Sequence, residues 1–473
     1  MKRKIQNYLQ CVILTILTAG IASSQKPRNV IMYIGDGYGL AAKTATRMAL
    51  GQGQSSKRFS TDSGFQALAI DKLKFVGLVT THSKNSWITD SAPGATVYAA
   101  GQKGKVHNEA VAFDLDLNQP VETILESAKK NGYAVGLVTT TRITHATPAD
   151  FAAHIWNRDI EDIIAAQYLS SSQQEYANIF GSSYDSLKHW ILPQPKIGVE
   201  LDVLLGGGSR HFLPKNGSSK NAIIVDENGN PVTKTIGGID TLKMAGRRSD
   251  NIDLIEIAKN RGYIYVNSRN AMNNIDITQF KPNNNAKLIG LFNADHVNYE
   301  QDRQLSATWE PSLPEMTELA IKVLRNKSPK GFFLMVEGGR IDHLEHANAG
   351  GIGFSSDTTK LALEYDHESF STDQIYTKSG ASVKRNIGIY GSDYLIKEVL
   401  AFDYSIEKGR ELLKDPTSST LIFSSSDHEC GGTAIVGLHD EADLQKNGLK
   451  IRTYAKTPSQ DTLYGVNNPR QLD

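Results

Sequence analysis

Cysteine is scarce in this sequence: its 473 residues include only Cys11 and Cys430. Cys11 lies in an N-terminal segment that we expect to be removed, so Cys430 would remain alone and no intrachain disulfide could form. The stability of the remaining chain cannot then come from disulfides. We expect Cys430 to be a small buried residue whose thiol is shielded.

The sequence also lacks an excess of charge of either sign, with 51 basic and 51 acidic residues. Removal of Lys2, Arg3 and Lys4 with the N-terminal segment takes three from the basic count and leaves 48. Nothing in this balance indicates a nucleic-acid partner.

Long apolar runs are absent except at the N-terminus. The run Val12 to Ala22 follows a basic start and ends in small residues, which is typical of a secretory signal peptide over residues 1–22. We therefore expect a secreted or periplasmic protein. An uncleaved membrane anchor is the alternative, although the run is shorter than the ~20 residues a spanning helix needs. No later stretch is apolar enough to form a transmembrane segment.

Short β-branched runs alternate with helix-like stretches along the rest of the chain. This rhythm predicts an α/β fold, a three-layer sandwich with a central, mostly parallel sheet and helices on both faces. The expected strands are Asn29–Ile34, Gly136–Thr140, Asp202–Leu205, Tyr263–Val266, Lys287–Phe292, Gly331–Val336 and Ser419–Ser424. The expected helices include Val121–Asn131, Asp250–Arg261 and Pro314–Arg325.

A polar stretch over residues 349–391 interrupts this rhythm, since it is rich in Gly, Ser, Thr and Asp. We interpret it as an insertion or lid within one catalytic domain over residues 29–473. Functional residues of such sheets gather at the carboxyl ends of the strands. The polar stretches that directly follow apolar runs are Gly35–Gly37, Thr141–Thr147, Glu337–His346 and Ser425–His428.

The stretch from Glu337 to His346 is the most specific of these. It places two carboxylates and two imidazoles, Glu337, Asp342, His343 and His346, within ten residues. If Asp342 opens a helix, His346 lies one turn on, where both side chains can bind one ion. Asp36, between two glycines, is by itself as consistent with a plain turn as with a site.

A second such cluster, Asp427-His428, follows the last apolar run. A mixture of Asp and His favours zinc, whereas an all-oxygen set favours magnesium. Each of these residues alone could be a solvated charge at a strand end. Their combination indicates a metal centre.

A nucleophile candidate, Ser91, lies among small residues at the start of a helix-like run, where free backbone N–H groups suit a phosphate. A plain helix cap explains the same pattern. A metal ion could activate this hydroxyl without a histidine partner. Arg158 could supply the guanidinium fork that suits phosphate, although an isolated helical Arg is more often at the surface.

Together these motifs resemble the alkaline phosphatase family, in order from about Asn29 to Gly437. The resemblance implies hydrolysis of phosphate monoesters through a phosphoserine at Ser91, with Arg158 on the phosphate oxygens. It further implies two zinc ions, one magnesium ion, and a homodimer. Two in-line displacements would proceed between two cations.

The resemblance also assigns the ligands. It implies Asp36, Asp427 and His428 for the second zinc, joined by the Ser91 oxygen. It implies Asp36, Thr147 and Glu337 for magnesium, and Asp342 with His346 for the first zinc. His145 and His343 resemble near-site histidines of the animal-type branch, and we expect them behind the ligands.

The first zinc site departs from the family pattern. In the family its third ligand is a further histidine near the carboxyl terminus. Here only His439 follows His428, too early and among acidic neighbours. Either the sequence is truncated or the first zinc site is weakened. The alternative function is therefore a phosphate- or metal-binding pseudoenzyme. A sulfatase is disfavoured because the sequence has no Cys-x-Pro-x-Arg motif.

Overall fold

The computed structural model of the protein describes residues 28–52, 67–101, 106–170, 172–181, 198–234, 240–241, 243–346, 374–376, 382–384, 392–415, 419–430, 438–439 and 451–452. The predicted signal peptide over residues 1–22 lies outside these ranges. So does most of the 349–391 stretch, and the domain boundaries stay predictions.

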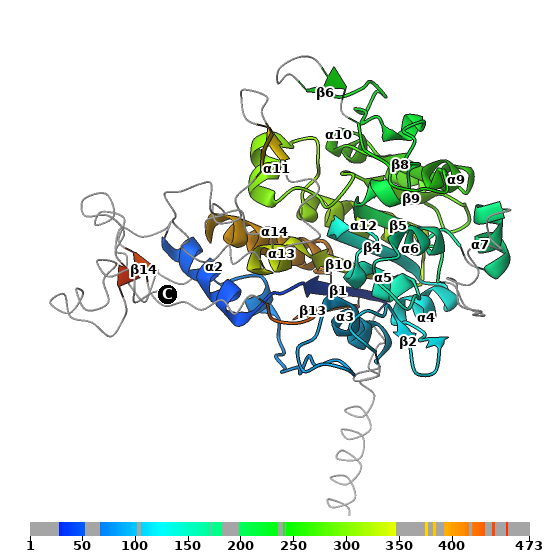
Figure 1. Ribbon diagram of the computed structural model, residues 1–473. Coiled ribbons are helices and arrows are strands. Elements are labelled where there is room, and N and C mark those ends of the chain that lie inside the picture. The colour runs from blue at the N-terminus through cyan, green and yellow to red at the C-terminus, as the bar shows by residue number, and fades with distance from the viewer. Residues whose placement is uncertain are drawn as a thin grey trace, which may run out of the picture.

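A seven-stranded sheet forms the centre of the molecule (Figure 1). Its strand order is β13-β1-β10-β4-β5-β9-β8, and every neighbouring pair is parallel. The strands are β1 (Asn29–Gly35), β4 (Ala134–Arg142), β5 (Val203–Gly207), β8 (Tyr263–Val266), β9 (Lys287–Leu291), β10 (Phe332–Gly338) and β13 (Thr420–Ser426). Each run predicted as a strand is one of these seven, so the prediction of a parallel sheet is confirmed.

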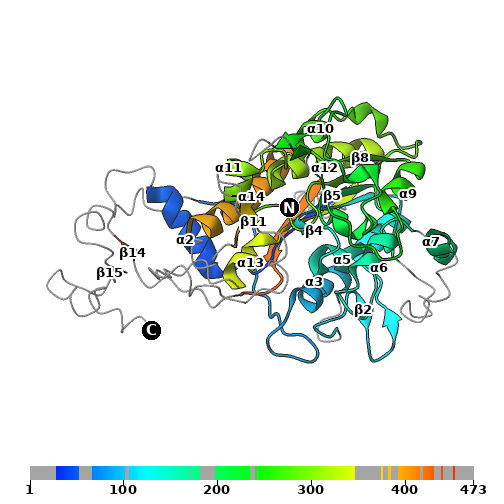
Figure 2. The ribbon, with the colours of Figure 1, turned by 45° about the horizontal axis from the view of Figure 1, so that its top comes forward.

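Helices cover both faces of this sheet (Figure 2). Successive side chains of β10 alternate between two apolar layers, with Phe333 and Met335 in one and Leu334 and Val336 in the other. The first layer holds α3 (Ser91–Ala100), α4 (Ile124–Lys130), α5 (Ala146–Ala152), α6 (Glu161–Gln167), α7 (Gln173–Phe180) and α9 (Leu254–Asn260). The second holds α2 (Leu40–Gln52), α10 (Arg269–Asn273), α12 (Leu313–Lys327), α13 (Arg340–His346) and α14 (Ser392–Leu412). The three-layer prediction is therefore confirmed.

Helix ends follow the capping residues of the sequence. Ser312 caps α12 and Thr123 caps α4, each in a capping box with the glutamate three residues on. The predicted helix over Val121–Asn131 accordingly begins later, at Ile124. No helix in the described part of the chain is long and apolar enough to cross a membrane.

Short elements complete the fold. α11 (Glu300–Ser306) packs on α14. Single 3-10 turns occupy Ile70–Lys72, Ser209–His211, Lys220–Ala222 and Ile277–Gln279. Two-stranded pairs are β2 (Phe113–Asp114) with β3 (Gln119–Pro120), β6 (Thr233–Lys234) with β7 (Asp240–Thr241), β11 (Gln374–Tyr376) with β12 (Ser382–Lys384), and β14 (Leu438–His439) with β15 (Ile451–Arg452).

A buried acid in α14 predicts a pH effect on stability. Burial raises the pKa of Glu398 to about 8, and the carboxylates of Glu300 and Asp302 add to the shift. Its contribution to folding is complete below the ordinary carboxyl pKa and is lost as pH rises to about 8, because the unfolded chain ionises first. We expect Glu398→Gln to match the wild type near pH 4. At pH 8 it should exceed the wild type by a few kcal/mol, at about 1.4 kcal/mol per pKa unit.

Urea unfolding of both proteins at the two pH values measures this difference. The amide oxygen introduced by Glu398→Gln would still accept the hydrogen bond that the Glu300 N–H donates to Glu398 at 2.6 Å, so the native contact is kept. An equal stability difference at pH 4 and pH 8 would contradict the assignment.

Candidate active site

Four neighbouring strands, β13, β1, β10 and β4, carry the predicted site residues at or after their carboxyl ends. Asp36 directly follows β1, Glu337 lies near the end of β10, and Asp427 and His428 follow β13. His145 follows β4 at the start of α5. Because these strands are adjacent in the sheet, segments nearly 400 residues apart meet at the carboxyl ends of the strands.

Gly37 allows the segment after β1 to lie close to α13 and to the segment after β13. Its φ is +64°, a left-handed conformation that glycine adopts without strain. A Cβ at this position would lie 2.9 Å from the Asp342 Cα and 3.1 Å from the Cys430 Cβ. Its N–H donates to Asp427 Oδ1 at 3.3 Å. The absence of a side chain therefore lets α13 and the segment after β13 close around Asp36.

Ser91 is the first residue of α3 and its side chain faces this centre. Its hydroxyl donates to Asp36 Oδ2 at 3.1 Å and lies 3.5 Å from His428 Nε2. Asp90 caps the helix and accepts from the Ser91 N–H at 2.6 Å. Ser91 is only 2% exposed. The structure thus brings the predicted nucleophile to the ligands predicted for the second zinc.

Two groups of metal-ligating side chains share Asp36. In the first, potential ligand atoms of Asp36, Asp427 and His428 lie within 4.8 Å of one another, and all three residues are buried. In the second, Asp36, His145 and Glu337 meet the same condition. The first is the predicted second-zinc set.

The second group differs from the predicted magnesium set of Asp36, Thr147 and Glu337. His145 enters it directly, whereas we expected this side chain behind the ligands. Thr147 lies in α5, and its buried Oγ1 has no hydrogen-bond partner among the described residues. The structure therefore adds a ring nitrogen next to the expected oxygen ligands.

A third group contains Asp342, His346 and Cys430. Asp342 and His346 lie one turn apart on α13, with Oδ1 and Nε2 3.4 Å apart, as their spacing predicted. Cys430 was not predicted as part of this group, and it is half-buried rather than buried. His439 lies in β14, but its side chain is outside the described residues.

The charges of the site fit cations. Four buried oxygens in it lack hydrogen-bond partners within the described ranges: Thr147 Oγ1, Glu337 Oε1, Asp342 Oδ1 and Asp427 Oδ2. Burial raises the pKa of Asp36 and Asp342 well above the ordinary range, and that of Asp427 to about 8. Burying so many carboxylates is costly without counter-charge, and bound divalent cations would supply it.

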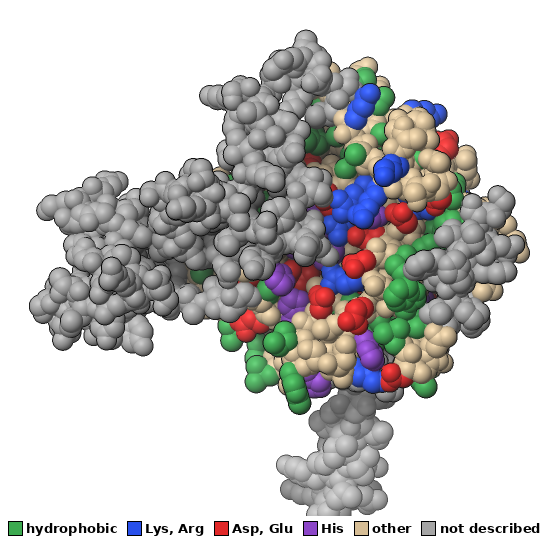
Figure 3. Space-filling model, viewed as in Figure 1, with side chains coloured by type: hydrophobic (Ala, Val, Ile, Leu, Met, Phe, Trp, Pro, Cys, Tyr) green, Lys and Arg blue, Asp and Glu red, His purple; other side chains and the backbone are tan. Residues whose placement is uncertain are grey.

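Arg158 places a guanidinium beside Ser91. Its Nη1 donates to Asp90 Oδ1 at 2.5 Å, and its Nη2 lies 3.0 Å from His145 Nε2. Although burial opposes the shift, the charge of Arg158 lowers the pKa of Asp90. On the face shown in Figure 3, acidic and histidine side chains gather near the middle, with basic side chains beside them. The middle of that face is thus mixed in charge.

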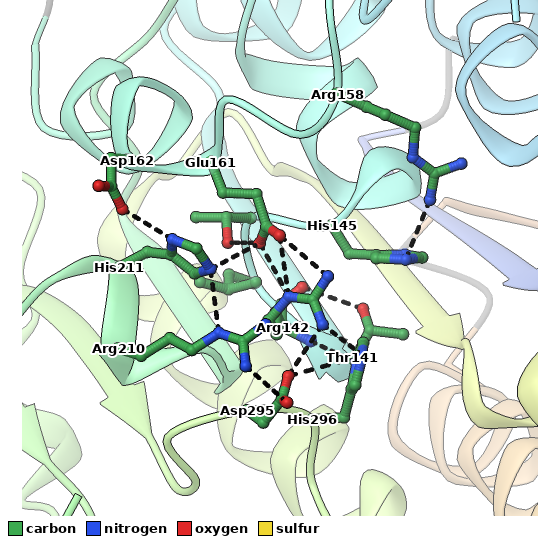
Figure 4. A network of polar contacts seen from close by, with 12 residues as sticks. Thr141, Arg142, His145, Arg158, Glu161, Asp162, Arg210, His211, Asp295 and His296 are labelled. Atoms are coloured by element: carbon green, nitrogen blue, oxygen red, sulfur yellow. Dashed lines mark hydrogen bonds and ion pairs between the residues drawn. The ribbon is translucent and has the colours of Figure 1, made fainter. Parts of the chain in front are cut away.

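A buried polar network lies behind His145 (Figure 4). The Arg142 guanidinium donates to Glu161 Oε2 at 2.9 Å and to Asp295 Oδ1 at 2.8 Å. The His296 ring lies 5.5 Å from the His145 ring. Burial, with Arg142 and other neighbouring cations, lowers the pKa of His296 well below its ordinary value, which keeps this imidazole neutral. The network holds the histidine layer under the site.

His343 belongs to the same layer. Its ring lies 4.4 Å from that of His296, and its Nδ1 lies 2.8 Å from Arg340 Nη1. It therefore packs beside His296 in the buried layer, and its role behind the ligands stays a prediction. Sequence reasoning missed Asp295 and His296, although they follow the predicted strand Lys287–Phe292. Asp36 was singled out because polar residues that follow an apolar strand were searched for, and the same search after this strand would have found Asp295 and His296.

Comparison with known families gives an independent view of the chain. The family profile described as alkaline phosphatase matches residues 27–357. The sequence is 32% identical to the tissue-nonspecific isozyme of alkaline phosphatase from Felis catus, over 94% of this chain and 82% of that protein. It is 30% identical to the repressible alkaline phosphatase of Saccharomyces cerevisiae, over 91% of this chain and 62% of that protein.

Solved structures show the same fold. The alkaline phosphatase of Thermus thermophilus superposes with a TM-score of 0.57 at 26% identity, over 87% of this chain and 62% of that one. The alkaline phosphatase of the Antarctic bacterium TAB5 superposes with a TM-score of 0.55 at 23% identity, over 88% and 84%. The three-layer architecture is therefore shared with these proteins.

Proposed function

Because the chain belongs to the alkaline phosphatase family, we propose that it hydrolyses phosphate monoesters through a phosphoserine at Ser91. One observation carries this proposal: the buried Ser91 hydroxyl donates to Asp36, and Asp36 belongs to two groups of metal-ligating side chains. A serine used only as a helix cap would not need such a neighbour.

The residues present fit two zinc ions and one magnesium ion. Asp36, Asp427 and His428 would hold one zinc, and Asp342 with His346 would hold the other. Asp36, Glu337 and Thr147, with His145 beside them, would hold magnesium. When bound, these cations supply positive charge that lowers the pKa of the attacking oxygen and stabilises the leaving oxygen.

The chain's own residues then do the following. Asp36 orients the Ser91 hydroxyl. Its oxygen attacks phosphorus and releases its proton to solvent, the ester P–O bond breaks, and the departing alcohol oxygen takes up a proton from solvent. Arg158 and the N-terminal N–H groups of α3 hold the non-bridging oxygens. Water next attacks phosphorus from the side vacated by the alcohol and loses a proton to solvent. The Ser91 O–P bond breaks, the Ser91 oxygen regains a proton, and inorganic phosphate leaves.

The experiment is an assay of p-nitrophenyl phosphate hydrolysis at alkaline pH with zinc and magnesium added. We expect turnover that chelation abolishes and that added metals restore. Bis(p-nitrophenyl) phosphate, a diester, should be a much poorer substrate. Phosphate binding without turnover, with both metals in excess, would favour the pseudoenzyme instead.

Arg158→Ala should weaken inhibition by inorganic phosphate by about 10- to 100-fold, the range for a hydrogen bond to a charged group. The reason is that Arg158 contacts Asp90, the chain neighbour of Ser91, and its guanidinium could turn its donors from Asp90 and His145 to the phosphate oxygens. Inhibition constants measure this effect. Arg325→Ala is the control, since Arg325 is exposed and contacts only the Leu412 carbonyl among described partners. Equal inhibition constants for both variants would contradict the role.

We further propose that the predicted signal peptide exports the protein and that it acts as a homodimer, as the family resemblance implies. Export into medium or periplasm, and a mass by light scattering of twice the chain, are the expected results.

A further inference from the structure

The third group of metal-ligating side chains points to a ligand that neither the sequence motifs nor the comparisons assign. We propose that Cys430, as a thiolate, is the third protein ligand of the zinc held by Asp342 and His346. This inference rests on the proposed function, since it concerns one of the same cation sites.

Proximity is the first argument. Potential ligand atoms of Asp342, His346 and Cys430 all lie within 4.8 Å of one another. Such a spread suits three ligands around one ion, because tetrahedral zinc binds sulfur at about 2.3 Å and nitrogen or oxygen at about 2.0–2.2 Å. The three side chains come from two segments, α13 and the turn after β13, which Gly37 allows to approach.

A buried, unsatisfied oxygen at the same place is the second argument. Asp342 is 5% exposed, and its Oδ1 has no hydrogen-bond partner among the described residues. The same oxygen lies 3.4 Å from His346 Nε2 and 4.0 Å from His428 Nε2, so it faces the centre. A buried carboxylate oxygen without a donor favours a cation.

The ligand chemistry is the third argument. One carboxylate, one imidazole and one thiolate match the oxygen, nitrogen and sulfur ligands that zinc accepts, and three protein ligands leave one position open, as in catalytic sites. The His346 side chain is 57% exposed, so the group is open towards solvent on that side. An all-oxygen magnesium site would not use sulfur.

A competing role for Cys430 is purely structural. Its side chain hydrogen-bonds with the Asp342 carboxylate, so it could merely orient that ligand. Substitution of Cys430 by serine distinguishes the two roles, because serine could take over the structural role but not that of a zinc ligand. A serine hydroxyl keeps the hydrogen bond to Asp342, but it does not provide a thiolate.

Cobalt(II) substitution separates these roles. In the full chain carrying Cys11→Ser, so that Cys430 is the only thiol, we expect a thiolate-to-cobalt charge-transfer band in the near ultraviolet. Cys430→Ala and Cys430→Ser should both lack this band. Each should also bind the weaker of the two zinc ions at least about 10- to 100-fold less tightly, the cost of losing even an outer partner of a metal ligand.

Outcomes of this experiment also separate the inference from the proposed function. Visible cobalt absorption and phosphatase turnover without the charge-transfer band would overturn the role of Cys430 and leave the function intact. Full zinc affinity in Cys430→Ser would do the same. Failure of the chain to bind any cobalt, together with an absence of turnover, would instead remove the metal-dependent function itself. Protection of Cys430 from iodoacetamide by stoichiometric zinc is a further expected result.

Discussion

We expect Ser91→Ala to lower kcat for p-nitrophenyl phosphate by at least about 10³-fold. Removal of the nucleophile of a serine hydrolase costs on the order of 10⁶ in kcat, and direct attack by water at a metal centre would recover only part of that loss. The effect should be chemical rather than structural. Ser91 is buried, but the helix cap of α3 comes from Asp90, which the substitution leaves in place.

Rapid acid quench followed by mass spectrometry gives the direct readout. The wild type should carry phosphate on the peptide that contains Ser91, and Ser91→Ala should carry none. Ser127→Ala is a matched control, because Ser127 lies in α4 and its hydroxyl contacts only Glu122 among described partners. Phosphate trapped on another residue, or activity retained in Ser91→Ala, would show that Ser91 is not the nucleophile.

Asp36→Asn should have the second-largest effect, because Asp36 belongs to two groups of ligands at once. We expect both a zinc and the magnesium to bind more weakly, each by more than the roughly 10- to 100-fold typical of a lost outer partner. Hydrolysis should therefore fall far below wild type at metal concentrations that saturate the wild type. Metal analysis after gel filtration should show fewer bound ions of both kinds.

Without metals, the same substitution should stabilise the protein at alkaline pH. Burial, Asp427 and Glu337 raise the pKa of Asp36 well above its ordinary value, and the pKa of Asp427 rises to about 8. Between about pH 4 and pH 8 the metal-free native state therefore binds more protons than the unfolded chain, and its stability falls as pH rises. Asparagine removes one of these charges.

Melting curves test this crossover. At pH 8 in chelator, Asp36→Asn should be more stable than the wild type by about 1 kcal/mol or more, since one pKa unit corresponds to about 1.4 kcal/mol. With zinc and magnesium present, the order should reverse. The exposed Glu227→Gln should change neither value. A variant at least as stable as the wild type with zinc and magnesium present would argue against a metal role for Asp36.

The sheet could be predicted because its strands are continuous apolar runs. Buried parallel strands need no polar alternation, so runs such as Phe332–Val336 stand out in the sequence. Their order in the sheet could not be read from the chain. The neighbours of β1 are β10 and β13, which lie some 300 and 390 residues away, and only long-range packing selects them.

The site could be predicted where polar residues directly follow such strands, as Asp36 and Asp427 do. The role of Cys430 was missed because a lone thiol carries no motif. Its neighbours Asp342 and His346 lie more than 80 residues before it. The Arg142 network was missed for a similar reason, since Glu161 begins α6, Asp295 lies in the segment after β9, and a single charged residue usually faces solvent.

The pairing of β1 with β13 has a consequence for the timing of activity. The Ser426 hydroxyl donates to the Gly35 carbonyl across 391 residues of sequence. A ribosome adding about 5–20 residues per second needs roughly 20 to 80 seconds to make that length. Contacts of such long range form late in folding. An incomplete chain therefore has Asp36 and Ser91 but neither Asp427 nor His428, and it cannot assemble the proposed site before residue 428 has been synthesised.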